Sequence, residues 1–268
     1  MKNTSKPYSV EKFPRIRKAT VDLLRAARRK NMIHSVVEVD ITGVRQRLRR
    51  LKNETGRFAS LTGYIVYCTA RAVDQNKHMH AYRKGGNRLV LYDEVDVSTT
   101  IERKVEGEPQ VVAMIVRAAN QKSVTDISEE IRDEKAKEAK EAEIYGSIRL
   151  FLAIPAFIRQ GIFRLLDRSP RLMKKRAGTI MVTSANLIGN GAFWGIPIAS
   201  HTLNVTIGGI VDRITEVNGI YEKRQHLCLT LSVDHDIVDG APAARFIRHL
   251  KKIIVKGAME TPGHKGLS

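Results

Sequence analysis

Apolar and polar positions alternate along the chain with two periods, one typical of helices and one of strands. Apolar side chains at helical intervals predict helices. The third of these is so densely apolar that it is expected to be largely buried. A fourth begins with the N-cap pattern SVTDISEEI and is predicted to continue through EKAKEAKEAE. The predicted helices of this part are residues 14–30, 43–54, 60–76 and the helix that starts at Ser123.

Runs rich in Val, Ile and Thr predict the strands. In the first half these are residues 35–41, a hairpin-like region around Gly85-Gly86, and a buried strand at 109–117. After residue 177 the chain becomes strongly β, in GTIMVTSANLIG, HTLNVTIGGIVDRI and HLCLTLSVDHDIVDG. The Asn-Gly at 218–219 predicts that the last two form an antiparallel hairpin. A closing helix, APAARFIRHLKKII, places Phe246, Leu250, Ile253 and Ile254 on its apolar face.

Residues 147–176 fit neither pattern well. They are apolar and basic, and Pro155 and Gly161 interrupt them, which predicts broken helices. We expect the apolar side to face inward along a subunit contact and the basic side to face outward. An amphipathic helix resting on an anionic membrane is the alternative.

Composition adds few constraints. The chain has 268 residues, 43% of them hydrophobic, enough for a substantial core without disulfides or a metal. Cys68 and Cys228 lie within apolar runs, so we expect reduced core residues of a cytoplasmic protein. No Cys/His spacing resembles a zinc site. No secretory signal is found, and a membrane-spanning helix is not expected.

The chain is strongly basic: it has 46 Lys and Arg residues and 28 Asp and Glu residues, which gives a net charge of +18. Such a balance raises a nucleic-acid hypothesis. The charges are dispersed, however, and the one compact basic run, residues 45–52, is interpreted as the solvated face of a helix. Nucleic acid is therefore not an expected partner, whereas other phosphorylated or acidic partners fit this charge.

The segment 231–250, LSVDHDIVDGAPAARFIRHL, carries the candidate chemistry. A strand delivers His235 at its end, Asp239 and Gly240 follow, and a helix opens at once. A histidine near its unperturbed pKa can take a proton from a thiol or hydroxyl that attacks an acyl carbon. A histidine at a strand end is also commonly only a structural group, so the motif alone leaves both interpretations open.

The wider sequence resembles the chloramphenicol acetyltransferases and the catalytic domain of the dihydrolipoyl acyltransferases of 2-oxoacid dehydrogenase complexes. The resemblance rests on the 231–250 segment and, in matching order, on PRIRKATVDLL, VVEVDITGVRQRLRRLK, RLVLYDEVDVSTTI, VVAMIVRAANQKSVTDISEEI and GTIMVTSANLIG. It implies a two-layer α/β sandwich, with a mixed sheet and helices on one face. It also implies trimers whose active sites lie between subunits.

The resemblance also implies roles for individual residues. His235 is the expected base, and Asp239 is the carboxylate that organises the loop, with Arg17 of the IRK motif as its candidate partner. A hydroxyl of the strand GTIMVTSANLIG is expected to stabilise the oxyanion. That hydroxyl is Thr183 or Ser184, which face opposite sides of the strand. Coenzyme A or an acyl-CoA is the expected substrate. No metal and no covalently bound lipoyl group are expected, and cofactor-binding residues are not identified.

Two departures from the family pattern qualify the resemblance. Asp236 stands where dihydrolipoyl acyltransferases usually carry arginine, and residues 147–176 are an insertion. The expected organisation is a tail at 1–13, one catalytic domain at 14–257 that includes the insertion, and a tail at 258–268. Neither a lipoyl domain nor a subunit-binding domain is recognised.

Two functions of different classes follow from these observations. The first is a stand-alone acyltransferase that moves an acyl group between coenzyme A, or a lipoyl-like thiol, and a thiol, hydroxyl or amine acceptor. The second is an oligomeric scaffold or cage core, with partner proteins of an oxoacid dehydrogenase-like system and with catalysis secondary or lost.

Overall fold

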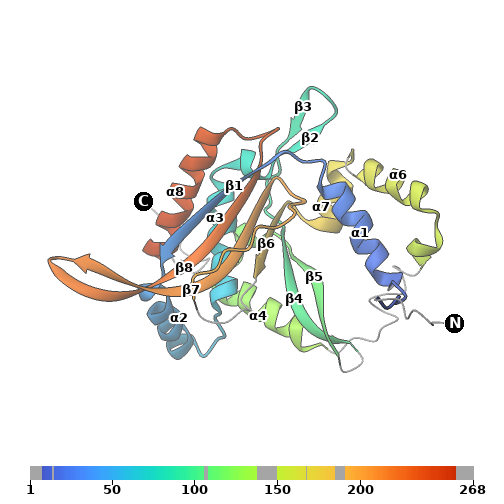
Figure 1. Ribbon diagram of the computed structural model, residues 1–268. Coiled ribbons are helices and arrows are strands. Elements are labelled where there is room, and N and C mark those ends of the chain that lie inside the picture. Colours follow the sequence, from blue (N-terminus) through green and yellow to red (C-terminus); the bar gives the residue numbers. More distant parts are fainter. Residues whose placement is uncertain are drawn as a thin grey trace.

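The computed structural model describes residues 8–13, 15–105, 108–137, 150–166, 168–184 and 191–257. Both helices and strands occur in each half of the chain (Figure 1). The α-helices are α1 (Arg15–Ala27), α2 (Thr42–Thr55), α3 (Leu61–Asp74), α4 (Val124–Ala136), α6 (Ala156–Leu166), α7 (Pro170–Ala177) and α8 (Gly240–Lys256). The strands are β1 (Met32–Asp40), β2 (Tyr82–Lys84), β3 (Arg88–Val90), β4 (Val97–Val105), β5 (Glu108–Val116), β6 (Ile180–Ser184), β7 (Leu203–Val217) and β8 (Ile220–Asp234).

Six strands form one mixed sheet in the order β1-β8-β7-β6-β4-β5. The strand β6 runs parallel to both β4 and β7, and the remaining neighbours are antiparallel. The predicted hairpin at 218–219 is confirmed, since Asn218 and Gly219 both adopt positive φ, as a tight β-turn of this kind requires. Its outer end projects well beyond the body of the molecule (Figure 1).

Four helices, α2, α3, α4 and α8, bury their apolar sides against one face of this sheet. The helix α3 is the most deeply buried of them, as its dense apolar sequence predicts, with ten buried residues. The helix α4 begins at the predicted cap, where Ser123 and Asp126 form a reciprocal capping box. The predicted two-layer α/β fold is therefore confirmed. Cys68 and Cys228 are free and buried, and burial raises the pKa of Cys68 to about 12.

The opposite face of the sheet is lined by Ser, Thr and Asn side chains, and residues 191–200 run close to it. Gly208 and Gly209 permit this approach, since a Cβ at either position would lie 2.0 Å from a carbonyl oxygen of Phe193 or Gly191. The indole nitrogen of Trp194 donates to the carbonyl of Val37, 3.1 Å away, and so ties this segment to the edge strand β1.

Two predictions need correction. The run 109–117 does form β5, but this strand is a sheet edge rather than a buried strand, and Val111 is 65% exposed. The described part of the segment 147–176 does form broken helices, but not with all its basic side chains outward, because Arg159 is buried. The stretch predicted to continue the helix past Ala136, through EKAKEAKEAE, falls mainly on residues 138–143, which lie outside the described residues.

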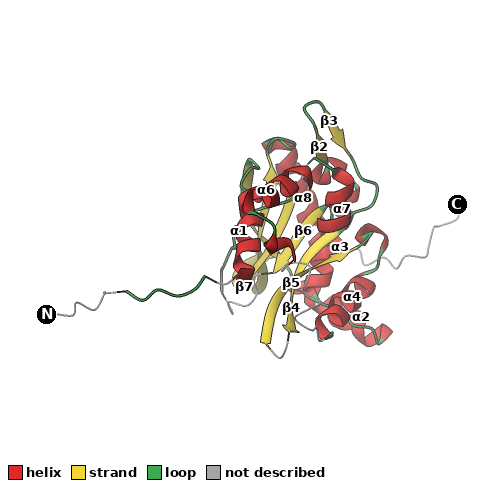
Figure 2. Cartoon of the chain, turned by 90° about the vertical axis from the view of Figure 1, so that its right-hand side faces the viewer, coloured by secondary structure: helices red, strands yellow, loops and turns green. Residues whose placement is uncertain are grey.

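The helices α1 and α6 lie side by side at the periphery, next to α7 (Figures 1 and 2). We call α1, α6 and α7 the peripheral lobe. None of the helices in the described part of the chain is long and apolar enough to cross a membrane.

Candidate active site

The strand β8 brings His235 to the end of the sheet. The backbone N–H of His235 donates to the carbonyl of Asn31, 2.7 Å away, which anchors the turn to the residue before β1. The ring Nδ1 of His235 lies 3.1 Å from the carbonyl oxygen of Val238. Because a carbonyl only accepts, Nδ1 carries the hydrogen of a neutral ring and Nε2 keeps its lone pair. The exposed ring is thus oriented as a proton acceptor.

The turn that holds His235 is organised by Asp234. The Asp234 side chain is buried, and its carboxylate accepts a hydrogen bond from Lys30 Nζ at 2.7 Å. It also accepts from the backbone N–H of Asp236 at 3.2 Å, and the Asp234 carbonyl accepts from Ile237 and Val238. Sequence reasoning missed both Lys30 and Asp234. An aspartate at the last position of a strand, just before a tight turn, was the available signal.

The Asp239 carboxylate does not hold the turn in the single chain. Asp239 is exposed and stands at the N-cap of α8, but its side chain makes no capping bond. Within the described residues it forms no hydrogen bond or ion pair, and none joins it to Arg17, which is exposed on α1. Asp239 instead lines a cavity of about 400 Å³ together with Asn76, His78 and Arg245. Its pairing with Arg17 remains a prediction.

Asp236 stands at the position where arginine is usual in the proteins that the sequence resembles. Its side chain contacts Asn31, just before β1, and Arg83 of β2. Its carboxylate accepts from Asn31 Nδ2 at 2.9 Å and lies 3.6 Å from Arg83 of the short β2–β3 hairpin. The loop after His235 is thereby connected to that hairpin.

Thr183 and Ser184 lie next to each other near the end of β6, on opposite faces. The hydroxyl of Thr183 is 2.8 Å from that of Thr100 on β4, on the sheet face opposite the core helices. Thr183 is also directly opposite Thr206 on β7. Ser184, by strand alternation, is directed to the helix-covered face. Thr183 is therefore the hydroxyl on the open, polar side of the sheet.

The strand register keeps Thr183 and His235 apart within one chain. Thr183 is opposite Thr206, which is opposite Thr230, and His235 follows Thr230 by five residues along β8. A rise of about 3.4 Å per residue and a strand spacing of about 4.8 Å separate them by roughly 20 Å. One chain therefore does not bring these two side chains to a common substrate atom.

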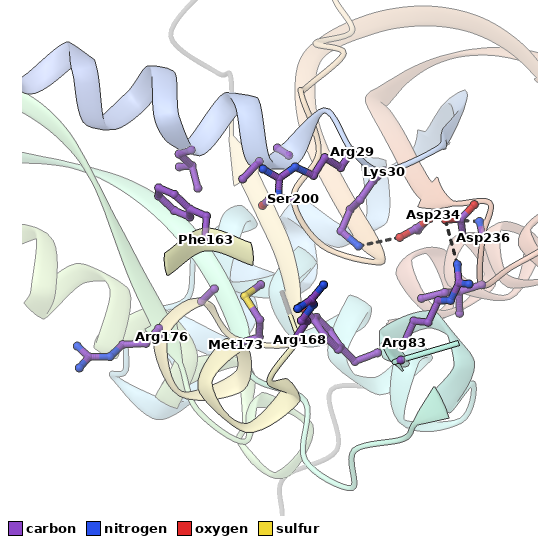
Figure 3. Close-up of a pocket in the computed structure, with 17 residues that line it drawn as sticks. Arg29, Lys30, Arg83, Phe163, Arg168, Met173, Arg176, Ser200, Asp234 and Asp236 are labelled. Atoms are coloured by element: carbon purple, nitrogen blue, oxygen red, sulfur yellow. Dashed lines mark hydrogen bonds and ion pairs between the residues drawn. The ribbon is translucent and has the colours of Figure 1, made fainter. Parts of the chain in front are cut away.

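A cavity of about 500 Å³ lies between the peripheral lobe and the His235 turn (Figure 3). Its apolar wall comes from α1, α6 and α7, with Leu23, Phe163 and Met173 among the side chains. Asp234, Asp236 and Ile237 of the turn line the opposite side. Five cations also line it, and of these Lys30 pairs with Asp234 and Arg83 with Asp236. These cations are Arg29, Lys30, Arg83, Arg168 and Arg176. The cavity can take a ligand with an apolar part and anionic groups.

His201 lies beside this cavity but is not available as a base. Its Nε2 donates to the carbonyl of Ala177 at 2.8 Å, and its Nδ1 lies 2.9 Å from the hydroxyl of Ser200. Burial lowers the pKa of His201 to about 4, so the ring is neutral near pH 7. It joins the end of α7 to the segment before β7. The described residues hold no group of three or more His, Cys, Asp or Glu side chains that could bind a metal ion.

Comparison with known proteins agrees with this architecture. The family model for the 2-oxoacid dehydrogenases acyltransferase catalytic domain matches residues 5–145 and 163–259. Among curated proteins, the chain is similar to a Saccharomyces cerevisiae enzyme, the mitochondrial dihydrolipoyllysine-residue succinyltransferase component of the 2-oxoglutarate dehydrogenase complex. The two are 25% identical over 225 residues, which are 81% of this chain and 41% of the yeast protein. This chain thus spans about two fifths of that relative's length.

Two solved structures share the fold at low identity. They are the cubic core of a pyruvate dehydrogenase multienzyme complex and the Azotobacter vinelandii dihydrolipoamide acetyltransferase. Each aligns with a TM-score of 0.66 and 16% identity, covering 95% of both chains. The family match, which extends over most of the chain, and the placement of His235 at the end of β8 lead to one conclusion: this chain belongs to the 2-oxoacid dehydrogenase acyltransferase family, through its catalytic domain.

Proposed function

We propose that the chain transfers an acyl group between coenzyme A and a thiol acceptor of the dihydrolipoyl type, with hydroxyl and amine acceptors as alternatives. The observation that carries this proposal is the orientation of His235. Its Nδ1–H is occupied by the carbonyl of Val238, so Nε2 is the atom that can accept a proton.

In the proposed reaction, Nε2 of His235 removes the proton of the acceptor thiol while the sulfur attacks the acyl carbon of acyl-CoA. The carbonyl oxygen becomes a tetrahedral oxyanion, to which the Thr183 hydroxyl donates a hydrogen bond. The intermediate then collapses with cleavage of the bond to the coenzyme A sulfur. That sulfur takes the proton back from His235, which regenerates the neutral ring.

The order of residues in a family member supports this assignment. Crystallographic and enzymatic work on the Azotobacter vinelandii enzyme addresses the catalytic role of a serine, a histidine and an asparagine. In that enzyme the serine lies 52 residues before the histidine, and the asparagine lies four residues after it. Thr183 and Asp239 stand at the same offsets from His235. Threonine keeps the hydroxyl, whereas Asp239 replaces a neutral amide with a carboxylate.

The active site would require two copies of the chain. His235 and Thr183 are roughly 20 Å apart in one chain, so a shared substrate needs His235 of one subunit and Thr183 of another. The structural similarity to a cubic multienzyme core supports an oligomeric assembly. We propose a trimer or a multiple of three, in which the 500 Å³ cavity takes acyl-CoA and its cations face the phosphates.

The test is a turnover assay of the purified protein with acetyl-CoA, succinyl-CoA and longer acyl-CoAs, with dihydrolipoamide as acceptor. His235→Ala should lower kcat by on the order of 10²–10⁴ without loss of the oligomer. His226→Ala is the matched control, since His226 lies on β8, the strand that leads to His235, and is next to Glu38, far from the turn. An intact wild-type oligomer that turns over none of these acyl-CoAs would favour the scaffold function.

A further inference from the structure

One face of α6 presents large apolar side chains to solvent. Phe157 is 75% exposed and Leu165 is 63% exposed. With Ile158, Gly161 and Arg164 they recur at helical spacing, so they share one side of the helix. We call these five residues the α6 face. Leu150, just before α6, is 74% exposed as well. Apolar side chains gathered in this way commonly mark an interaction site.

Polar contacts hold α6 in this orientation. Arg159 is buried, and its Nε donates to Asp22 of α1 at 2.7 Å. Gln160 Nε2 donates to the other oxygen of Asp22 at 3.0 Å. Arg159 also donates to the carbonyl of Ile154, 2.6 Å away. The helix thus directs two polar side chains toward α1, and Phe157 and Leu165 away from it. The exposure of the α6 face follows from these bonds rather than from a loose attachment.

The surroundings of the α6 face are basic. The sequence from 150 to 177 holds seven Lys and Arg residues and one acidic residue, Asp167. Asp22, the one acidic residue of α1, is buried against Arg159. The peripheral lobe exposes cations on α1, on α6 and on the segment through α7. Those of α6 and α7 are Arg164, Arg168, Arg171, Lys175 and Arg176. A second copy of the same lobe would meet this surface with like charge, which opposes a symmetric self-contact.

We propose that the α6 face docks on the surface of an anionic lipid bilayer, with Phe157 and Leu165 inserted at the headgroup level and the surrounding cations facing lipid phosphates. An apolar strip within a basic surface is the pattern of an interfacial helix. Residues 146–162, which hold the first half of the α6 face, fall in the gap of the family match. Phe157, Ile158 and Gly161 therefore lie outside the family match, whereas Arg164 and Leu165 lie within it. The docking proposal does not depend on the proposed acyl transfer.

The experiment is co-sedimentation of the full chain with phosphatidylcholine vesicles, with and without phosphatidylglycerol. Wild-type protein should bind the anionic vesicles, and added salt should weaken this binding. The double variant Phe157→Glu/Leu165→Glu should lower the partition coefficient at least tenfold. The matched control is Ile214→Glu/Ile220→Glu, two exposed side chains of the β7–β8 hairpin that should leave vesicle binding unchanged.

Light scattering and circular dichroism of each variant complete the test. A folded double variant of unchanged oligomeric state that no longer binds anionic vesicles supports the proposal. The proposal is overturned if wild-type protein does not bind anionic vesicles, or if wild type and the double variant bind them equally. The proposal is also wrong if wild-type protein does not bind lipid and the double variant dissociates into smaller oligomers. The α6 face would then be a contact between copies of the chain.

Discussion

At the scale of single residues, the side chains nearest His235 act by fixing the direction of its ring. The Asp234 carboxylate is enclosed by Lys30 and the backbone of the turn, and the Val238 carbonyl selects the tautomer. Neither group needs to touch a substrate. In the proposed reaction both groups determine whether Nε2 is presented to a substrate, so we propose Asp234 as a positioning residue.

We expect Asp234→Asn to lower the free energy of unfolding by about 1–3 kcal/mol, because it removes the buried carboxylate charge that the half-buried Lys30 faces. Asp239→Asn should change it by less than about 0.5 kcal/mol in the dissociated chain, since its carboxylate is exposed. Urea unfolding of both variants gives the comparison. An equal or larger loss for Asp239→Asn would show that the predicted pairing with Arg17 forms after all.

Stability should also fall in mild acid through the buried histidine His201. Burial lowers its pKa to about 4, against about 6.5 in an unfolded chain, so the unfolded state binds the proton first as pH falls. The contribution of His201 is therefore complete above about pH 6.5 and is lost as pH falls toward 4. Unfolding free energies at pH 7.5, 6 and 5 should decline less steeply in His201→Gln, whose amide can still donate to Ala177. An unchanged slope would contradict this.

At the scale of elements, the contact between α6 and α1 contains one buried ion pair. The side chains of Arg159 and Asp22 are nearly inaccessible, and the neighbouring Gln160 also bonds to Asp22. A pair of this kind contributes little compared with apolar packing, but removing one partner leaves an uncompensated charge.

Asp22→Leu alone should therefore destabilise the contact between α1 and α6 by about 3–5 kcal/mol, and Asp22→Leu/Arg159→Leu by clearly less. Hydrogen exchange of the α6 amides measures the effect locally, where global unfolding would miss it. Equal exchange in the single and double variants would mean that Arg159 finds another partner when Asp22 is absent.

At the scale of the whole molecule, the separation of Thr183 from His235 makes a subunit-mixing experiment decisive. Thr183→Val should cost on the order of a hundredfold in turnover, and Ser184→Ala much less. Co-expression of His235→Ala chains with Thr183→Val chains should nevertheless restore about a quarter of the wild-type activity, because randomly mixed closed rings contain sites with both residues intact. Activity no greater than that of the separate variants would place both residues of a site in one chain.

Much of the fold could be predicted from the sequence. The spacing of apolar residues that marks a helix or a strand depends only on residues close together in the chain. The apolar density of 60–76, the cap at Ser123 and the Asn-Gly turn at 218–219 all act within a few residues, and all three appear in the structure. The order of motifs around His235 likewise identified the family, which the comparison confirms. The family can be identified from the order of these motifs without knowing which helices and strands are in contact.

Only the tertiary structure decided what depends on distant partners. Asp234 organises the turn within the single chain because Lys30, far away in sequence, reaches its carboxylate. Arg159 faces inward because Asp22, 137 residues earlier, compensates its charge, and that in turn exposes Phe157. The strand register separates Thr183 from His235 and makes a second subunit necessary for the proposed site. Pairings of this kind are set by how the sheet and helices pack, and no local pattern of residues encodes them.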